Sequence, residues 1–218
     1  LTATGYLRHW IYEYNNRDAR GQWETILNDL TDTTGDVFLG AGMQCARCHD
    51  HKFDPILQRD YFALRSFFTN VLPVEDRPAW TAAEAAEHGD KQAEWERRTA
   101  ATRAALAELE RKYRDKAEKE AVGRFPDDVQ AMIRKPAADR SPLETQVAAL
   151  AWRQVDYEFN RLENSIKGAD SVKHADLKRK LAEHDKLKPA ERPHVLAVRE
   201  TGAQGLDAVI PKKNTVVP

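Results

Sequence analysis

Cys45-Ala46-Arg47-Cys48-His49 is the stretch from which the organisation of this chain can be worked out. Its two cysteines are the only ones among the 218 residues, and a histidine directly follows the second. A disulfide framework would need more cysteines, spread along the chain. Two isolated thiols beside an imidazole indicate a chemical site instead.

The spacing of these residues satisfies the requirements for covalent attachment of haem c. Two thiols separated by two residues can form thioethers with the vinyl groups on one porphyrin edge, and the adjacent histidine can bind the iron. We therefore predict haem c as the cofactor, bound through Cys45 and Cys48. We predict His49 as the proximal iron ligand and His51 as a further residue of the site.

Side chains around the motif could complete a haem pocket. Apolar residues that could wall the porphyrin are Phe38, Leu39, Met43, Phe53, Tyr61, Phe67 and Phe68. Arg47, His51 and Lys52 are candidate partners of the propionates. The sixth iron ligand stays open: His9 and Met132 are distant enough in sequence to reach the other face. A solvent-bound sixth position would point to catalysis at the haem rather than to electron transfer.

Two other interpretations of the motif remain. Cys-x-x-Cys also suits tetrahedral zinc, with His49 and His51 completing four ligands within seven residues. Alternatively, the two thiols form a structural or redox-active disulfide. In both cases the chain would be a non-haem structural or interaction module.

Outward from the motif, residues 1–75 are rich in aromatic residues and predict a small helical domain. We expect a helix over 23–30 and a turn or helix break over 33–35. Asp54 and Pro55 have the pattern of an N-cap followed by proline at the first helical position. The helix that they open should bury one stripe of side chains: Ile56, Leu57, Leu64, Phe67 and Phe68.

Residues 76–190 are highly charged and predict an antiparallel, coiled-coil-like helical hairpin after a linker marked by Pro73 and Pro78. Spacings of four and three residues define a seam on the first helix: Trp95, Thr99, Thr102, Leu106, Leu109 and Tyr113. A second helix should begin near Pro142, and 172–187 form a third helical run. Residues 191–218 should begin a following domain, or a tail with a strand over 193–198.

Composition excludes several classes of function. The net charge of −1 gives no electrostatic basis for binding nucleic acid or an anionic membrane. No apolar run approaches the ~20 residues that span a bilayer, and no catalytic motif for hydrolysis is present. We expect the remaining histidines to be solvated: His88, His174, His184 and His194.

Several stretches resemble one known family. They are TGYLR at 4–8, DTTG at 32–35, VFLG at 37–40, CARCHDHKFDPI at 45–56 and QRDYF at 58–62. Over 1–75 the chain is similar to planctomycete cytochrome-c-like proteins, and more narrowly to the domain of unknown function that follows their N-terminal cytochrome c module. The resemblance gives no support for a particular reaction.

The resemblance implies a piece of a large periplasmic or secreted protein whose signal peptide lies outside this sequence. The implied partner is a redox protein or a neighbouring cytochrome c domain of the same chain. We therefore expect a mainly α protein that acts as an electron-transfer module rather than as a stand-alone enzyme.

Overall fold

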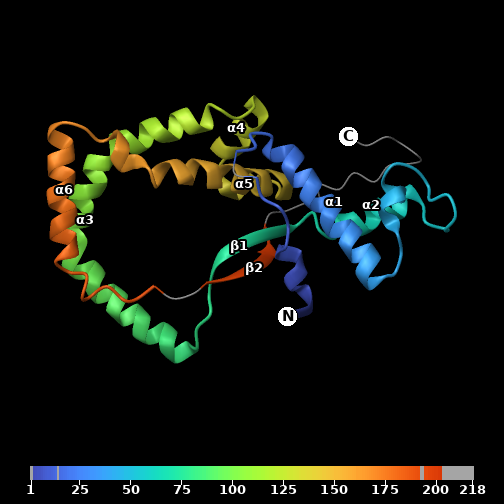
Figure 1. The fold of residues 1–218 in the computed structure, drawn as a ribbon, viewed down its shortest axis with the longest axis horizontal. Helices are drawn as coiled ribbons and strands as arrows, with labels where there is room; N and C mark the ends of the chain where they lie inside the picture. The colour runs from blue at the N-terminus through green and yellow to red at the C-terminus, as the bar shows by residue number, and fades with distance from the viewer. Residues whose placement is uncertain (1, 14, 192–193, 203–218) are drawn as a thin grey trace. The chain divides into compact units, whose positions relative to one another are not determined.

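The computed structural model describes residues 2–13, 15–191 and 194–202. The described part is mainly helical, as expected, with one two-stranded sheet (Figure 1). Its elements are η1 (Thr2–Arg8), α1 (Ala19–Phe38), η2 (Met43–Arg47), α2 (Gln58–Ser66), β1 (Val71–Pro78), α3 (Ala82–Val122), α4 (Asp127–Arg134), η3 (Ala137–Asp139), α5 (Pro142–Phe159), η4 (Leu162–Ser165), α6 (Ala169–Ala182) and β2 (His194–Glu200), where η denotes a 3₁₀-helix.

The chain divides into two compact units. Unit 1 groups Leu1–Val74 with Phe125–Arg153 and Ala197–Pro218, as far as their residues are described. Unit 2 groups Glu75–Arg124 with Gln154–Leu196 on the same condition. Residues 125–153, which the sequence assigned to the charged hairpin, therefore belong with the motif-bearing unit.

Helix α1 is longer than the sequence predicts, because it continues through the expected break at 33–35. The hydroxyl of Thr34 donates to the carbonyl of Leu30 at 2.6 Å, so this threonine is satisfied inside the helix. Gly35 also serves packing, since a Cβ there would lie 3.1 Å from the Met43 side chain. The helix ends before Gly40, which has a φ of 61°.

Helix α2 begins at Gln58, so the prediction that Asp54 and Pro55 open it is wrong. The backbone N–H of Leu57 donates to the Asp60 carboxylate and that of Gln58 donates to Asp50, both at 2.9 Å. These two carboxylates cap the helix in place of Asp54. The expected stripe is shifted as a result: Phe67 is exposed, and the buried side chains of α2 are Gln58, Tyr61, Phe62 and Arg65.

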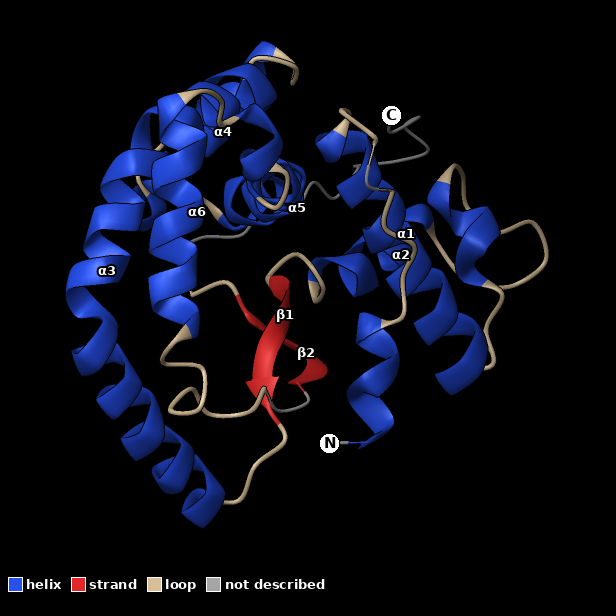
Figure 2. Cartoon of the chain, turned by 60° about the vertical axis from the view of Figure 1, so that its left-hand side comes forward, coloured by secondary structure: helices blue, strands red, loops and turns tan. Residues whose placement is uncertain are grey.

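Strand β1 forms where the sequence indicated a linker, and it pairs with β2 (Figure 2). Thr201, just after β2, donates its N–H to the carbonyl of Asn70, just before β1, at 2.9 Å. The strands are therefore antiparallel. Pro73 is tolerated because each strand of a two-stranded sheet is an edge, where a missing N–H need not break the ladder.

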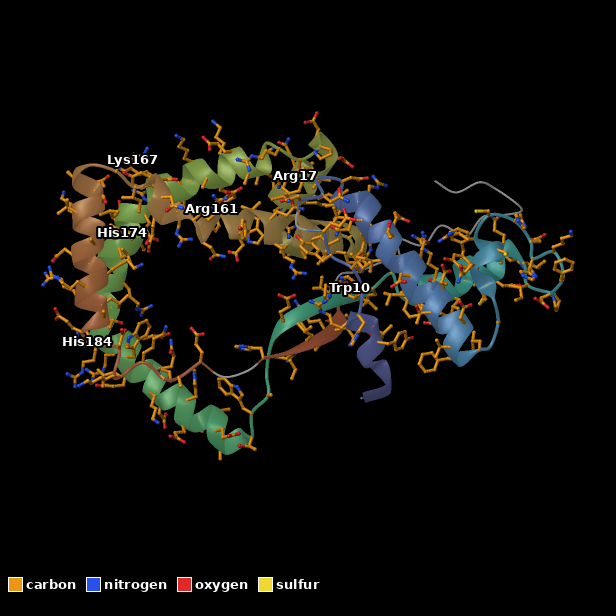
Figure 3. All side chains as sticks on the ribbon, in the orientation of Figure 1. Trp10, Arg17, Arg161, Lys167, His174 and His184 are labelled. Carbon is orange, nitrogen blue, oxygen red and sulfur yellow. The ribbon has the colours of Figure 1, made fainter. Side chains whose placement is uncertain are left out.

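In unit 2, α3 pairs with α6 in antiparallel fashion. The Tyr113 hydroxyl donates to Asp170 at 2.9 Å, and one turn back Glu110 contacts His174 at 3.0 Å. His174 is buried on the face of α6 that meets α3 (Figure 3), so the prediction that it is solvated is wrong. Thr99 of the predicted seam is fully buried. The first helix of the hairpin thus pairs with the third helical run.

Across the described residues, no helix combines the length and the apolar character required to cross a membrane.

Candidate functional site

The 3₁₀-helix η2 presents three rows of side chains, because every third residue of such a helix falls on the same side. Met43 and Ala46 form the inner row. Both are buried in a core cluster with Tyr61 and Phe62 of α2. The inner row therefore anchors the Cys-x-x-Cys-His motif to α2 by apolar packing.

Gln44 and Arg47 form the second row, which faces α1. The Gln44 amide donates to the Asp36 carboxylate at 3.0 Å. The Arg47 guanidinium lies 3.6 Å from the Asp32 carboxylate. Asp32 and Asp36 are one helical turn apart on α1, so they meet the two residues of this row in register.

Cys45 and Cys48 form the third row, and both are exposed free thiols. The Cys48 N–H donates to the Cys45 carbonyl at 3.4 Å, which closes the turn between them. Because the residues are three apart at the end of a 3₁₀-helix, their side chains are directed to the same side. This arrangement suits both a single porphyrin edge and a disulfide.

His49 follows the third row and is exposed. Its Nδ1 lies 2.8 Å from the carbonyl oxygen of Asp50. A carbonyl oxygen only accepts hydrogen bonds, so Nδ1 carries the ring proton and Nε2 keeps its lone pair. Metal-bound histidines are typically oriented in this way, by a hydrogen bond from the nitrogen that does not bind the metal.

His51 is used within the loop that precedes α2. Its Nδ1 accepts from the backbone N–H of Asp54 at 2.9 Å. The Asp54 carboxylate is 3.1 Å from the same nitrogen. Nδ1 cannot accept a hydrogen bond from the backbone N–H and donate one to the carboxylate at the same time. The contact with the Asp54 N–H is the shorter of the two, so the carboxylate is a close neighbour of His51 rather than its ion-pair partner.

Two further polar contacts hold the motif to the first turn of α2. The buried side-chain amide of Gln58 donates to the Arg47 carbonyl at 3.1 Å. The Asp50 carboxylate accepts from the Gln58 backbone N–H at 2.9 Å. Arg47 is therefore held both by its backbone and by its side chain, which faces Asp32.

Burial sets the electrostatics beneath the motif. It raises the pKa of the Asp32 carboxyl group above its ordinary value, although the nearby Tyr61 hydroxyl and Arg47 guanidinium act in the opposite direction. It also raises the pKa of Tyr61, with the Asp32 charge adding to the effect. Asp32 is thus less acidic than an ordinary aspartate.

This raised pKa predicts how stability depends on pH. The folded chain binds the Asp32 proton more tightly than the unfolded chain, so this group destabilises the fold progressively as pH rises from about the unfolded value through the folded pKa. Urea unfolding of wild type and Asp32→Asn between pH 4 and 8 should show the difference in unfolding free energy moving in favour of the variant as pH rises. Parallel pH profiles of the two proteins would contradict the prediction.

The side chains expected to wall the haem separate into two groups. Met43, Tyr61 and Phe68 are buried in the protein core. Four others are exposed: Phe38, Leu39, Phe53 and Phe67. Of the expected propionate partners, Arg47 faces Asp32, whereas Lys52 lies over the Phe53 ring at 5.0 Å.

The two candidate sixth ligands, His9 and Met132, lie outside α1, and their neighbouring segments contact different ends of that helix. Arg20, near the start of α1, is 3.5 Å from Asp128 of α4, the helix that carries Met132. The motif lies against Gly35, 15 residues further on, which corresponds to roughly 20 Å of helix. The start of α4 thus lies beside the end of α1 that is remote from the motif, which makes Met132 the less favourable of the two candidates.

His9 is exposed just after η1, and η1 does approach the motif end of α1. The hydroxyl groups of Tyr6 and Thr34 are 2.8 Å apart, and the Tyr6 ring centroid lies 5.0 Å from that of Phe38. His9 stays a candidate for the sixth ligand.

The zinc alternative needs ligands that converge on one point. Within 2–13, 15–191 and 194–202, no group of three or more His, Cys, Asp or Glu side chains is arranged to hold a metal ion. The two cysteines and the two histidines of 45–51 do not gather into a zinc site in this conformation.

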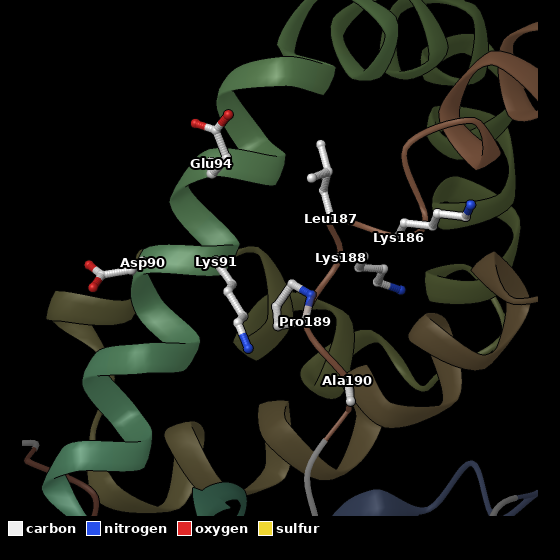
Figure 4. A pocket seen from close by; sticks show the side chains of 8 residues that line it. All are labelled: Asp90, Lys91, Glu94, Lys186, Leu187, Lys188, Pro189 and Ala190. Atoms are coloured by element: carbon white, nitrogen blue, oxygen red, sulfur yellow. The ribbon is translucent and has the colours of Figure 1, made fainter.

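Unit 2 contains a pocket of about 450 Å³ between residues 90–94 of α3 and the segment after α6 (Figure 4). Its acidic residues include Glu94, which already pairs with Arg97 and Arg98. Leu187 and Pro189 supply its apolar wall. Its lining contains no cysteine, serine, threonine or histidine, so the motif in unit 1 remains the candidate site.

Sequence reasoning did not identify the polar residues that support the motif: Asp32, Asp36, Asp50 and Gln58. Their role depends on how α1 and α2 pack against η2. The one available signal is the spacing of four between the two α1 carboxylates, which matches one helical turn.

Comparison with known proteins gives one family match. Residues 1–72 match the model of PSCyt2, described as a protein of unknown function (DUF1549). The matched residues include η1, α1, η2 and α2, and hence the whole candidate site. No curated protein and no solved structure matches the chain.

Proposed function

We propose that the motif-bearing part of unit 1 binds haem c covalently and serves as an electron-transfer module of a larger exported protein. The observation that carries the proposal is the third row of η2, in which two free, exposed thiols lie on one side of a turn and His49 follows them. The planctomycete cytochrome-c context belongs to this proposal, because the matched family itself has no assigned function.

The residues present fit haem c on three counts. Both thiols are unpaired and on one side, as thioether formation requires. The Nδ1–carbonyl hydrogen bond of His49 leaves Nε2 as the iron-binding nitrogen. Exposed Phe38, Leu39 and Phe53 provide apolar surface near the motif in sequence.

In this role, Cys45 and Cys48 would hold the porphyrin and His49 would bind the iron from one face. Bound haem c would supply a one-electron redox couple. The protein residues would set the orientation of the imidazole through the Asp50 carbonyl and hold the motif through η2. The sixth iron ligand is unassigned. Electron transfer requires no substrate at that position, so it is the simplest function for a bound haem c.

The first test is production of the full chain together with a haem c attachment system. We expect stoichiometric iron and a Soret band that survives extraction with acidified acetone. Colourless, iron-free protein would overturn the proposal. Zinc without iron, or a mass two hydrogens below that of the dithiol, would identify the metal-binding or disulfide alternative instead.

A pair of variants separates the two histidines of the motif. His49→Ala should lose the low-spin or five-coordinate spectrum of the wild type, since the iron loses its protein ligand on that face. His51→Ala, the matched control, should keep the wild-type spectrum because its Nδ1 serves the loop. We expect the loss of haem-iron affinity to be at least about tenfold larger in His49→Ala than in His51→Ala, the scale of loss at metal sites. Equal spectral changes in the two variants would contradict this assignment.

A further inference from the structure

Asp32 is an unusual residue to find beneath an apolar core cluster. Its side chain is only 17% exposed, and within the described residues its buried Oδ1 makes no hydrogen bond of ordinary geometry, although the nearby Tyr61 hydroxyl favours the ionised carboxyl group. Its other oxygen lies 3.6 Å from the guanidinium of Arg47, which stands between the two cysteines. The only charged group that Asp32 meets on η2 therefore belongs to the motif.

A buried carboxylate with an unsatisfied oxygen lowers stability, and a neutral side chain of similar size would avoid the desolvation. Burial also raises the pKa of this group. Asp36, one turn further along α1, is exposed and contacts Gln44 instead. Of these two carboxylates, the one that costs stability by its burial is therefore also the one that faces the Arg47 guanidinium.

We propose that Asp32 is a positioning residue of the Cys45–His49 turn and acts through Arg47. The inference rests on the proposed function. With the guanidinium held toward α1, the second row of η2 keeps facing that helix. Cys45, Cys48 and His49 then remain together on the exposed side. Without the carboxylate, the Arg47 side chain is free to swing out toward the thiols and the incoming porphyrin edge.

This role predicts two measurable changes in Asp32→Asn. The yield of extraction-resistant haem should fall about tenfold, the scale observed when a residue that orients a metal ligand is removed. In the haem-free chain, alkylation of the two cysteines by iodoacetamide at pH 7 should become faster, because a guanidinium beside a thiol favours the reactive thiolate. If Asp32→Asn merely loosened the packing, alkylation would become faster whether or not Arg47 was present.

Asp29→Asn is the matched control, since it removes a carboxylate from an exposed position of the same helix. Arg47→Gln tests the contact from its other side at a residue whose side chain is 40% exposed, so folding is less at risk. The combination of Asp32→Asn with Arg47→Gln completes a double-mutant cycle. Thermal melting of each variant checks that the fold is retained.

We expect Asp32→Asn to have no added effect once Arg47 is replaced, and Asp29→Asn to behave as wild type. Additive effects in the double variant, or an alkylation rate in Asp32→Asn equal to that of Asp29→Asn, would overturn the positioning role. The two proposals fail separately: a wild-type chain that acquires no haem refutes the proposed function, whereas alkylation of the haem-free chains still decides the role of Asp32.

Discussion

Replacement of both Cys45 and Cys48 by alanine is expected to abolish all haem that survives extraction with acidified acetone. The two cysteines are the only thiols in the chain, so no other side chain can form a thioether with the porphyrin. Any haem that the variant still binds would be held through His49 alone and should dissociate on extraction. We expect a loss below the detection limit of a pyridine haemochrome assay.

The loss should come from chemistry and not from unfolding. Both cysteines are exposed, and exposed substitutions away from special features change stability by about 0.5 kcal/mol or less. The melting temperature of the double variant should therefore match that of the haem-free wild type. Single variants are the internal control, because each should retain one thioether and a haemochrome band shifted from that of the wild type. Extraction-resistant haem in the double variant would contradict the proposed attachment.

The contrast between η2 and α2 shows what the sequence could predict about this site. The motif is local, so the spacing of its cysteines could indicate a common ligand, whereas the 3₁₀-turn that directs both thiols to one side is known only from the structure. At the start of α2, several nearby carboxylates could accept hydrogen bonds from the free backbone N–H groups, and the sequence alone does not show which of them do. Asp54 carries the usual N-cap pattern, yet Asp60 and Asp50 take the exposed backbone N–H groups, because the loop folds back so that His51 N–H donates to the Ile56 carbonyl at 2.8 Å.

Long-range pairings explain most of the remaining differences. Strand β1 contains proline and reads as a linker until β2 supplies its partner, more than 100 residues later. His174 lies in a charged stretch and is buried because α6 presents it to Glu110 of α3. The role proposed for Asp32 likewise depends on its contact with Arg47 of η2, which sequence spacing does not predict. Periodicity predicted the helical class because helix periodicity is local, whereas these partners are set by tertiary packing.

Truncation of Tyr61 should produce the largest loss of stability near the site. Tyr61 is fully buried, packs its ring against Phe62 with centroids 5.3 Å apart, and joins the cluster that holds the inner row of η2. We expect Tyr61→Ala to lower the free energy of unfolding by about 3–5 kcal/mol, the usual range for a buried aromatic residue replaced by alanine. Because small domains are stable by only about 5–15 kcal/mol, urea unfolding should detect this change easily.

Tyr61→Phe is the control that separates packing from polarity. It keeps the ring and removes a hydroxyl group that lies 3.5 Å from Asn28 Oδ1, so the cost should stay below about 1 kcal/mol. The same change removes a group that favours the ionised form of Asp32, and so it should raise the Asp32 pKa further and steepen the loss of stability with rising pH. If Tyr61→Ala were no more destabilising than Tyr61→Phe, the inner row would not be anchored by this cluster. The outward presentation of Cys45, Cys48 and His49 would then have to depend on the polar contacts that the motif makes with α1 and with the first turn of α2.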